Sequence, residues 1–254
     1  MVAQAVTRVD PHVKILDDEV VRRAKRAGLD VLVYAPHFTH ISEVRDRARR
    51  YTDEGLLVVP AREYFTDRWD RRRHVLAIDP AEPIPDFLTF DATMAELDTL
   101  DATVLGPHPR FLTMSLSRED VLEYSHLFDA VEVYCPKNWW FHTRRMQSLA
   151  SETDLQPYVS SYAHLPSTVG EVWTEYETTI ETADDLRRAI EDDVPHTLYR
   201  NDGLRHELQC KAEFFHLARE NTWEKFRRVV LENREATNPL DSRYDDRFAE
   251  RSAY

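Results

Sequence analysis

Short apolar runs alternate with amphipathic segments along the first 195 residues. The run RVDPHVKI surrounds His12, and the segment DDEVVRRAKRAG that follows has acids first, apolar residues at helical spacing, and Gly28 as a stop. The next pair has the same form, because LDVLVYAPH ends in His37 and precedes a polar-faced segment that Gly55 closes. These patterns predict a strand followed by a helix, twice in succession.

The same alternation continues along the chain. Further strands are expected at residues 56–59, 74–78, 101–109, 129–136, 155–164 and 171–177, and further helices at residues 94–100, 117–128, 141–153 and 182–192. Continuous apolar runs are typical of strands covered on both faces, as in parallel sheets. About seven strand and helix units with short connections predict a closed parallel α/β barrel rather than an open sheet.

The C-terminal part has a different pattern. Residues 204–231 place Leu208, Phe215 and other apolar side chains at helical spacing, which predicts one or two helices that cover the barrel wall. The last residues are polar and aromatic without periodicity, so we expect a tail that drapes over the surface or frays. The predicted division is a barrel over residues 1–200 and a helical cover with a tail over residues 201–254.

Composition narrows the classes of partner. The formal net charge is -13, and 46 acidic residues outnumber 33 lysines and arginines. This balance argues against a nucleic-acid coat protein or a membrane-surface binder. Only five of the basic residues are lysines. Acid excess with arginine in place of lysine is typical of a halophilic protein in a salt-rich cytoplasm, where charges are strongly screened.

Cysteine usage and hydropathy indicate where the protein is located in or outside the cell. Cys135 and Cys210 are far apart and unaccompanied, which indicates reduced thiols inside a cell rather than a disulfide framework. No run approaches the roughly 20 apolar residues of a membrane helix, and the N-terminus lacks the apolar core of a signal peptide. We therefore expect a cytoplasmic protein with no membrane partner.

Five histidines and one glutamate fall at the ends of predicted strands. They are His12, His37, Glu63, His74, His108 and His164. Catalytic groups of a parallel barrel project from the rim formed by the strand ends, so these side chains are expected to converge. Neutral imidazoles with one bridging carboxylate form a good ligand set for zinc, manganese or iron. The sequence therefore predicts one or two divalent metal ions at this rim.

The remaining histidines are assigned no role. His126 and His142 lie on predicted helices, and His196, His206 and His216 lie in the C-terminal third without strand partners. We expect these to be surface or hydrogen-bonded histidines.

The order of these motifs resembles the polymerase and histidinol phosphatase (PHP) family, in a haloarchaeal-like version. DPHVK, APHFTH, AREYF, HVLAI, GPHPR, VEVY and SSYAH stand where the family has DxHxH, a DH pair, G-x-E, H-x-L, HP, I-E-V and S-D-A-H. The resemblance covers about residues 8–195. It implies a distorted (β/α)7 TIM-like barrel, a cluster of up to three metal ions, and hydrolysis of phosphate esters. By the same resemblance, Glu63 is the bridging acid, and the five histidines named above are ligands.

Three departures from the family pattern indicate a partly degenerate metal site. Lys14 stands in place of a histidine, and Pro36 and Tyr162 stand in place of aspartates. The ammonium of Lys14 could supply the positive charge of a missing ion. We expect one intact ion site and loss of the third. The intact site would use Glu63, His74 and His108, and a second ion could be held by His12, His37 and His164 with Glu19 or His40.

The predicted roles follow from this placement. Lys14 and Glu63 are the catalytic candidates, and Arg73, Arg110 and Tyr162 are the substrate-binding candidates, since arginine matches phosphate geometry. Each assignment has an alternative. Lys14 could instead be a structural cation paired with Asp10 or Glu63. The RRR run that contains Arg73 could be a solvated loop, and Tyr162 could fill the vacated metal position.

The predicted function is that of a metal-dependent phosphoesterase acting on a small phosphorylated substrate, either a phosphomonoester or a nucleotide. The altered positions 14, 36 and 162 favour an alternative, a catalytically degenerate binding or assembly module of the same fold. A third candidate is a nuclease that trims nucleic-acid ends, which the acidic charge disfavours. The sequence leaves the oligomeric state open.

Overall fold

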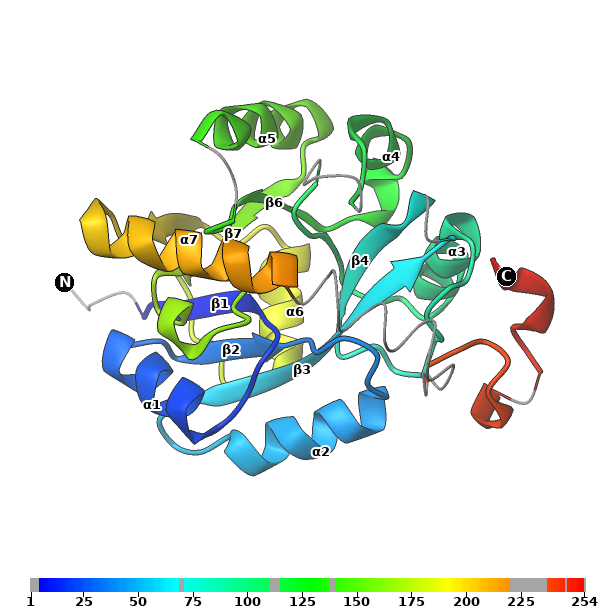
Figure 1. Ribbon diagram of the computed structural model, residues 1–254, viewed down its shortest axis with the longest axis horizontal. Coiled ribbons are helices and arrows are strands. Elements are labelled where there is room, and N and C mark those ends of the chain that lie inside the picture. The colour runs from blue at the N-terminus through cyan, green and yellow to red at the C-terminus, as the bar shows by residue number, and fades with distance from the viewer. Residues whose placement is uncertain are drawn as a thin grey trace.

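A computed structural model describes residues 5–68, 71–109, 115–137, 140–219, 237–244 and 246–253. In this part of the chain, nine strands form one sheet in the order β7-β6-β5-β4-β3-β2-β1-β8-β9, which curls into a nearly closed barrel (Figure 1). The strands are β1 (Thr7–Val13), β2 (Val31–Tyr34), β3 (Leu57–Thr66), β4 (Arg73–Ile78), β5 (Val104–Gly106), β6 (Ala130–Tyr134), β7 (Gln156–Val159), β8 (Val172–Tyr176) and β9 (His196–Arg200).

The barrel closes where the segment after β7 returns to the end of β1. Val13 forms a parallel bridge with Ala163, and the amide of Lys14 donates a 2.9 Å hydrogen bond to the carbonyl of Ala163. The prediction of a distorted TIM-like barrel is therefore confirmed, with β8 and β9 added as an antiparallel extension beside β1.

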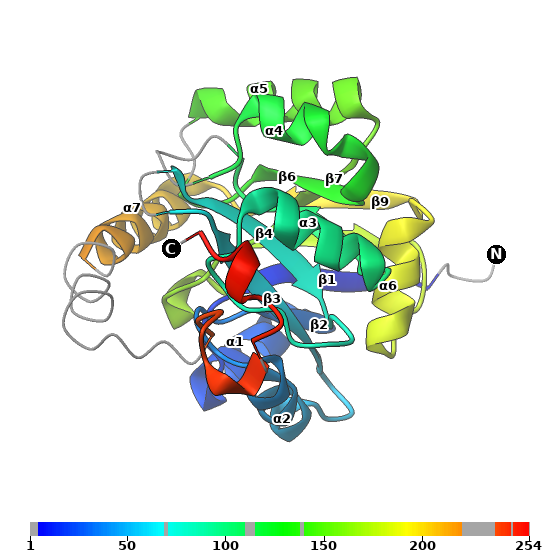
Figure 2. The same ribbon diagram turned by 90° about the vertical axis from the view of Figure 1, so that its right-hand side faces the viewer.

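Seven helices surround the described sheet (Figures 1 and 2). They are α1 (Asp18–Ala27), α2 (Ile41–Tyr51), α3 (Phe90–Thr99), α4 (Arg118–Glu123), α5 (Trp140–Thr153), α6 (Ala183–Glu191) and α7 (Gly203–Arg219). The first of them begins and ends as its sequence predicts. The Asp17 carboxylate accepts a hydrogen bond from the amide of Val20, and Gly28 ends the helix with a φ of 74°.

The structure corrects the prediction of an all-parallel barrel at β4. This strand runs antiparallel to both of its neighbours, β3 and β5. Only residues 67–72 join β3 to β4, which is too short for a crossover helix, so the two strands form a hairpin. Because of this hairpin, the end of β3 and the start of β4 lie at the same rim of the barrel. Leu76 lies opposite Glu63, and His74 lies opposite Phe65.

Strand β3 is also longer than predicted. It continues beyond Val59 to Thr66, although Pro60 lies in its middle. Residues 57–60 pair with β2, whereas residues 61–66 pair with β4, so the proline lies where the strand changes partners. A proline is tolerated there because it interrupts neither ladder in its interior. The extension places Glu63 within the strand rather than in a loop.

The C-terminal part differs from its prediction in two ways. His196 lies in β9 and faces Tyr176 of β8, so it does have a strand partner. The apolar stripe of α7 was predicted to pack on the barrel, but Leu208 and Phe215 are 57% and 72% exposed. The helix instead packs through Glu213 and His206, because it covers a polar rim. The second half of the predicted helical region lies outside the described residues.

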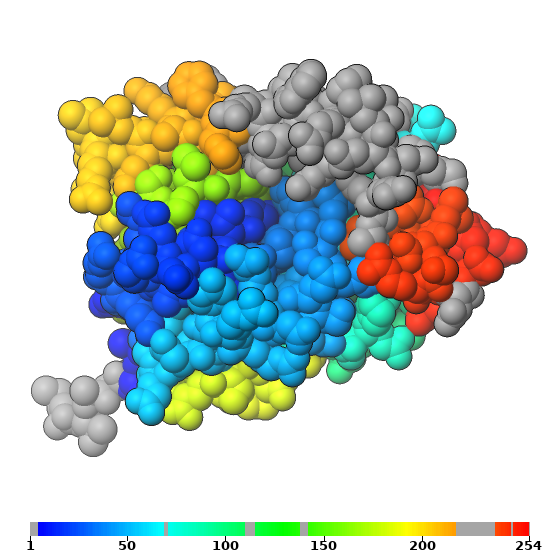
Figure 3. Space-filling model, turned by 60° about the horizontal axis from the view of Figure 1, so that its bottom comes forward, coloured from blue at the N-terminus to red at the C-terminus, as the bar shows by residue number. Residues whose placement is uncertain are grey.

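The described C-terminal residues pack against the region after β4. The amide of Asp86 donates to the carbonyl of Thr237, and Leu88 forms a bridge with Ser252. Tyr244 is buried and stacks on His40 at the start of α2, with ring centroids 5.6 Å apart. Figure 3 shows the red C-terminal residues at one end of the face formed by the blue N-terminal helices. The predicted draping tail is thus a packed segment in its described part.

The helices were compared with the length and hydropathy of membrane-spanning segments. Among the helices of the described residues, none has the length and apolar character needed to span a bilayer.

Candidate metal centre

Glu63 lies at the centre of a buried cluster at the barrel rim. Its side chain is fully buried, and its Oε1 atom faces ring nitrogens that come from β1, from β4 and from the loop after β5. Oε1 is 3.8 Å from His12 Nε2, 3.6 Å from His74 Nδ1 and 3.5 Å from His108 Nε2. The ligand atoms of His12, Glu63 and His108 lie within 4.8 Å of one another. Two imidazoles and one carboxylate oxygen thus surround one point, and the His74 ring lies beside them, with its Nδ1 atom in a 3.1 Å hydrogen bond with His108 Nε2.

The other carboxylate oxygen of Glu63 has different partners. Oε2 accepts hydrogen bonds from the Lys14 ammonium and, at 2.8 Å, from His37 Nε2. The ammonium also donates to the carbonyl of Ala35 at 2.7 Å. Lys14 comes directly after β1, so its side chain enters the cluster beside that of His12. Glu63 therefore has one oxygen toward a set of imidazoles and one oxygen bound to a fixed cation.

Burial determines the charges in the cluster. It lowers the pKa of His12 and of His108 well below the ordinary value, so both rings are neutral and keep a lone pair for a metal ion. Burial opposes ionisation of Glu63, but the Lys14 ammonium and the neighbouring His74 and His37 lower its pKa well below the ordinary value. Burial lowers the pKa of Lys14 to about 8, against the opposing effect of Glu63.

The cluster satisfies the requirements of a divalent ion of the zinc, manganese or iron class. Among the described residues, neither ring nitrogen of His12 has a hydrogen-bond partner, and neither does Oε1 of Glu63, although all three atoms are buried. Buried polar atoms are ordinarily hydrogen-bonded, so their convergence without partners indicates a missing ligand. Imidazole nitrogen and carboxylate oxygen are the donor types that such ions prefer.

Two buried acids hold the ligand-bearing backbone in place. Asp10 Oδ1 accepts hydrogen bonds from the amides of Ser161 and His12, at 3.0 and 3.4 Å. Glu132 Oε2 accepts from the amide of His108 at 2.7 Å. Burial raises the pKa of Asp10 to about 7 and that of Glu132 to about 8. Glu132 belongs to the VEVY motif of the sequence, but neither acid was among the predicted site residues.

The ammonium of Lys137 is a second cation, on the far side of the cluster. Its Nζ atom is 2.7 Å from His164 Nδ1, donates to the carbonyl of Tyr162, and lies 3.6 Å from Glu213 Oε2. Glu213 comes from α7 and accepts from the amides of His164 and Leu165. Sequence reasoning missed both Lys137 and Glu213. The position of Lys137 after the strand VEVYCP in a lysine-poor chain was a signal, but Glu213 offered none.

Tyr162 lies inside the cluster. Its ring stacks on His108 with centroids 4.4 Å apart and lies 4.8 Å from the ring of His12, and Lys137 Nζ is 3.6 Å from its centroid. The residue is 3% exposed and has a φ of 44°, a backbone conformation that is uncommon outside glycine and typical of functional positions. This placement agrees with the alternative that Tyr162 fills a vacated metal position.

Three predicted residues, Arg73, Glu19 and His40, are not brought into the cluster. Arg73 pairs with Asp67 and Asp120 and covers Phe90, because successive strand residues point to opposite faces and His74 faces the cluster. Glu19 bonds to an arginine on the surface of α1, and His40 stacks on the C-terminal segment. Arg110 lies outside the described residues.

Comparisons with known proteins concern the family and the fold of the chain. The family model described as "PHP-associated" matches residues 141–194, a stretch that includes Tyr162 and His164. No curated protein sequence matches the chain. The family match and the fold neighbours described next support the resemblance to the PHP family.

Several solved structures share the fold at low sequence identity. PsfC from Pseudomonas syringae PB-5123 is 16% identical with a TM-score of 0.60, over 84% of this chain and 99% of that chain. A two-domain protein from Bacteroides vulgatus that contains a predicted PHP-like metal-dependent phosphoesterase is 17% identical with a TM-score of 0.55, over 84% and 70%. The lesion-specific endonuclease PfuEndoQ from Pyrococcus furiosus is 14% identical with a TM-score of 0.57, over 76% and 58%.

Proposed function

We propose that this protein is a metal-dependent phosphoester hydrolase with one divalent ion and one fixed ammonium at its centre. The proposal rests on the different partners of the two Glu63 carboxylate oxygens. Its Oε1 faces three imidazole nitrogens, and its Oε2 is bound by Lys14. An acid that would bridge two ions instead bridges an ion site and a lysine side chain.

The residues of the cluster would have different roles in hydrolysis. His12, Glu63, His74 and His108 would hold the ion. A divalent ion at this position would bring the pKa of a bound water toward neutrality and attract phosphoryl oxygens. Lys14 stays beside Glu63 and offsets its charge, so that an anionic phosphate can approach a buried carboxylate. Lys137 places a second positive charge on the side of His164.

The substrate class follows from charge and from burial. The ligand side chains are nearly inaccessible, and the His37 side chain, at 8% exposure, is the most exposed of those that contact Glu63. We propose that a small phosphomonoester reaches the centre from the side of His37. The net charge of -13 disfavours a long anionic polymer as the substrate. Nucleotides and sugar phosphates both satisfy these limits.

The test is hydrolysis of 4-nitrophenyl phosphate with added manganese at high salt. We compare the native protein with Glu63→Ala and His108→Ala, and use Arg50→Ala, an exposed change on α2, as the control. Loss of a ligand should lower the rate by at least about 100-fold, because ligand losses exceed the 10- to 100-fold effects of their supporting residues. A Glu63→Ala variant that folds and keeps the native rate contradicts the proposal.

The rival function is a binding module of the same fold without turnover. Tyr162 and Lys137 favour it, because both side chains occupy space beside the imidazoles that a further ion or a substrate would use. A protein that binds one manganese ion per chain but hydrolyses no phosphomonoester would support the module. A DNA duplex with an abasic site, like the substrate bound by one endonuclease Q neighbour, belongs in the same assay. Cleavage of that duplex alone would favour a nuclease.

A further inference from the structure

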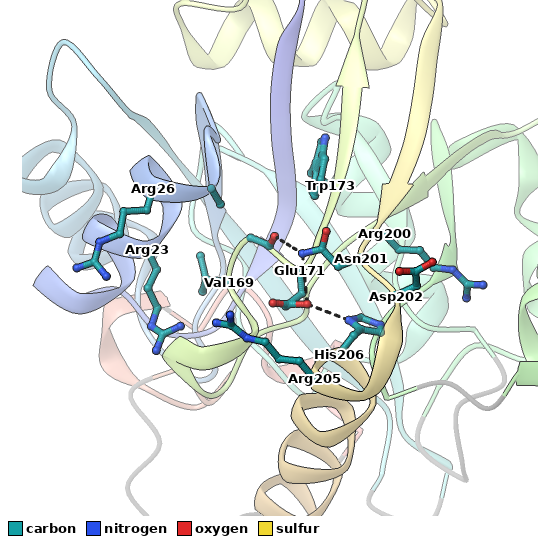
Figure 4. Close-up of a pocket in the computed structure, with 12 residues that line it drawn as sticks. Arg23, Arg26, Val169, Glu171, Trp173, Arg200, Asn201, Asp202, Arg205 and His206 are labelled. Atoms are coloured by element: carbon teal, nitrogen blue, oxygen red, sulfur yellow. Dashed lines mark hydrogen bonds and ion pairs between the residues drawn. The ribbon is translucent and has the colours of Figure 1, made fainter.

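A second polar pocket lies on the outside of the barrel, away from Glu63. It has a volume of about 580 Å³ and is bounded by α1, the start of β8, the end of β9 and the start of α7 (Figure 4). None of the proposed metal ligands lines it. In its lining, His206 is hydrogen-bonded to Glu171 at 3.1 Å and to the hydroxyl of Tyr134 at 2.9 Å.

Guanidinium groups dominate the walls of this pocket. Arg23 and Arg26 line it from α1, Arg200 from the end of β9, and Arg205 from the first turn of α7. Figure 4 shows Arg23 and Arg205 extending toward one another from opposite walls. Arg23 bonds to Glu19 on its own helix at 3.1 Å, whereas Arg26 and Arg205 form no ion pair within the described residues. We call this place the arginine pocket.

The acids in the arginine pocket cancel only part of its positive charge, because two carboxylates, Glu171 and Asp202, face four arginines in its lining. Glu171 Oε2 is already bound by His206 and, at 3.3 Å, by Asn201. Asp202 lies beside the start of α7, on the other side of His206 from Arg205 in Figure 4. In a chain whose net charge is -13, four arginines around one hollow are a departure from the average surface. The start of α7 adds the positive end of a 17-residue helix.

The wall between α1 and β8 is rigid. Gly170 has a φ of 83°, and a Cβ atom at this position would lie 2.4 Å from the Cβ of Ala27. The turn that contains Gly170 is therefore in close contact with the end of α1, directly beside Arg23 and Arg26. This contact fixes the backbone of α1 against the turn, so the two arginines start from a fixed part of the wall.

We propose that the arginine pocket binds a small phosphorylated molecule of about nucleotide size. The volume lies inside the roughly 300 to 1,000 Å³ range of small-molecule sites. Guanidinium groups bind phosphate oxygens with paired hydrogen bonds, which suits Arg26 and Arg205, whose donors are not engaged by acids. Trp173 forms part of the lining, with its ring stacked on that of Tyr199 at a centroid distance of 5.3 Å.

The experiment is calorimetric titration with inorganic pyrophosphate of protein freed of metal by a chelator. We compare the native protein with the double variant Arg26→Ala and Arg205→Ala. The control is the double variant Arg22→Ala and Arg50→Ala, which removes the same charge from exposed positions outside the pocket. The native protein and the control should bind one pyrophosphate, and the pocket variant should bind at least tenfold more weakly. Its 4-nitrophenyl phosphate hydrolysis should stay at the native rate, which separates this proposal from the proposed function.

Three results would overturn the proposal. The first is equal affinity of the pocket variant and the native protein, and the second is no binding by the native protein. The third is tighter binding of a single-stranded oligonucleotide than of pyrophosphate with the same dependence on Arg26 and Arg205, which would make the surface a nucleic-acid contact.

Discussion

Replacing Lys14 by methionine removes the cation that neutralises Glu63 when no metal is bound. The Lys14 side chain is 4% exposed and that of Glu63 is 0% exposed, so the pair is buried. Methionine keeps much of the length and volume of lysine but leaves the Glu63 Oε2 atom with His37 alone, and leaves the carbonyl of Ala35 without its ammonium donor. Breaking one side of a buried ion pair costs about 3 to 5 kcal/mol of folding free energy.

This magnitude translates into a large change in melting temperature. For a domain of this size, about 1 kcal/mol corresponds to roughly 2 to 4 °C, so metal-free Lys14→Met should melt roughly 6 to 20 °C below the native protein. The assay is thermal or denaturant unfolding followed by circular dichroism in the presence of a chelator. The matched control is Lys25→Met, because Lys25 forms a comparable ion pair with Asp53 on the surface. That variant should melt close to the native protein, since exposed pairs contribute little.

A metal ion should reverse part of the loss. Adding manganese places positive charge beside Glu63 and should raise the melting temperature of Lys14→Met more than that of the native protein. If metal-free Lys14→Met loses less than about 1 kcal/mol of unfolding free energy, the reasoning is refuted. Lys14 and Glu63 would not then form a buried ion pair of the kind described.

The remaining predictions concern packing around the two sites. Gly170→Ala should lose about 1 to 3 kcal/mol of stability through overpacking against α1, whereas Gly203→Ala, with a φ of 87° and open space around it, should lose only about 1 kcal/mol; equal losses in urea unfolding would contradict this. Glu213→Ala should cost about 3 kcal/mol and increase amide exchange in α7, because three donors and Lys137 lose their acceptor. The control Glu207→Ala is exposed, and an effect equal to that of Glu213→Ala would count against the assignment.

The barrel could be predicted from sequence because its elements carry local signals. Acids at the start and glycine at the end define α1, and continuous apolar runs define the strands. The direction of β4 carries no such signal, because an apolar run has the same composition in either direction. The short connection of residues 67–72 was the available clue. The prediction that Leu208 and Phe215 pack on the barrel was wrong, because helical periodicity identifies an apolar face but does not say whether the neighbouring surface is apolar.

The candidate site was predictable where ligands follow strands. Glu63 and His74 were identified from two successive runs, and the β3–β4 hairpin explains why they meet. The position of Arg73 was also readable in advance, because it precedes His74 in the same strand and must face the other way. Glu213 was not predictable, since it reaches the cluster from a helix about 50 residues beyond His164 through tertiary packing alone.

The most direct test of the central claim is anomalous diffraction from crystals grown with manganese. The account predicts one peak among His12, Glu63, His74 and His108, on the Oε1 side of the carboxylate, with the Lys14 ammonium still bound to Oε2. No peak at Glu63 in protein that hydrolyses phosphomonoesters, or a peak that displaces Lys14 from Oε2, would contradict it.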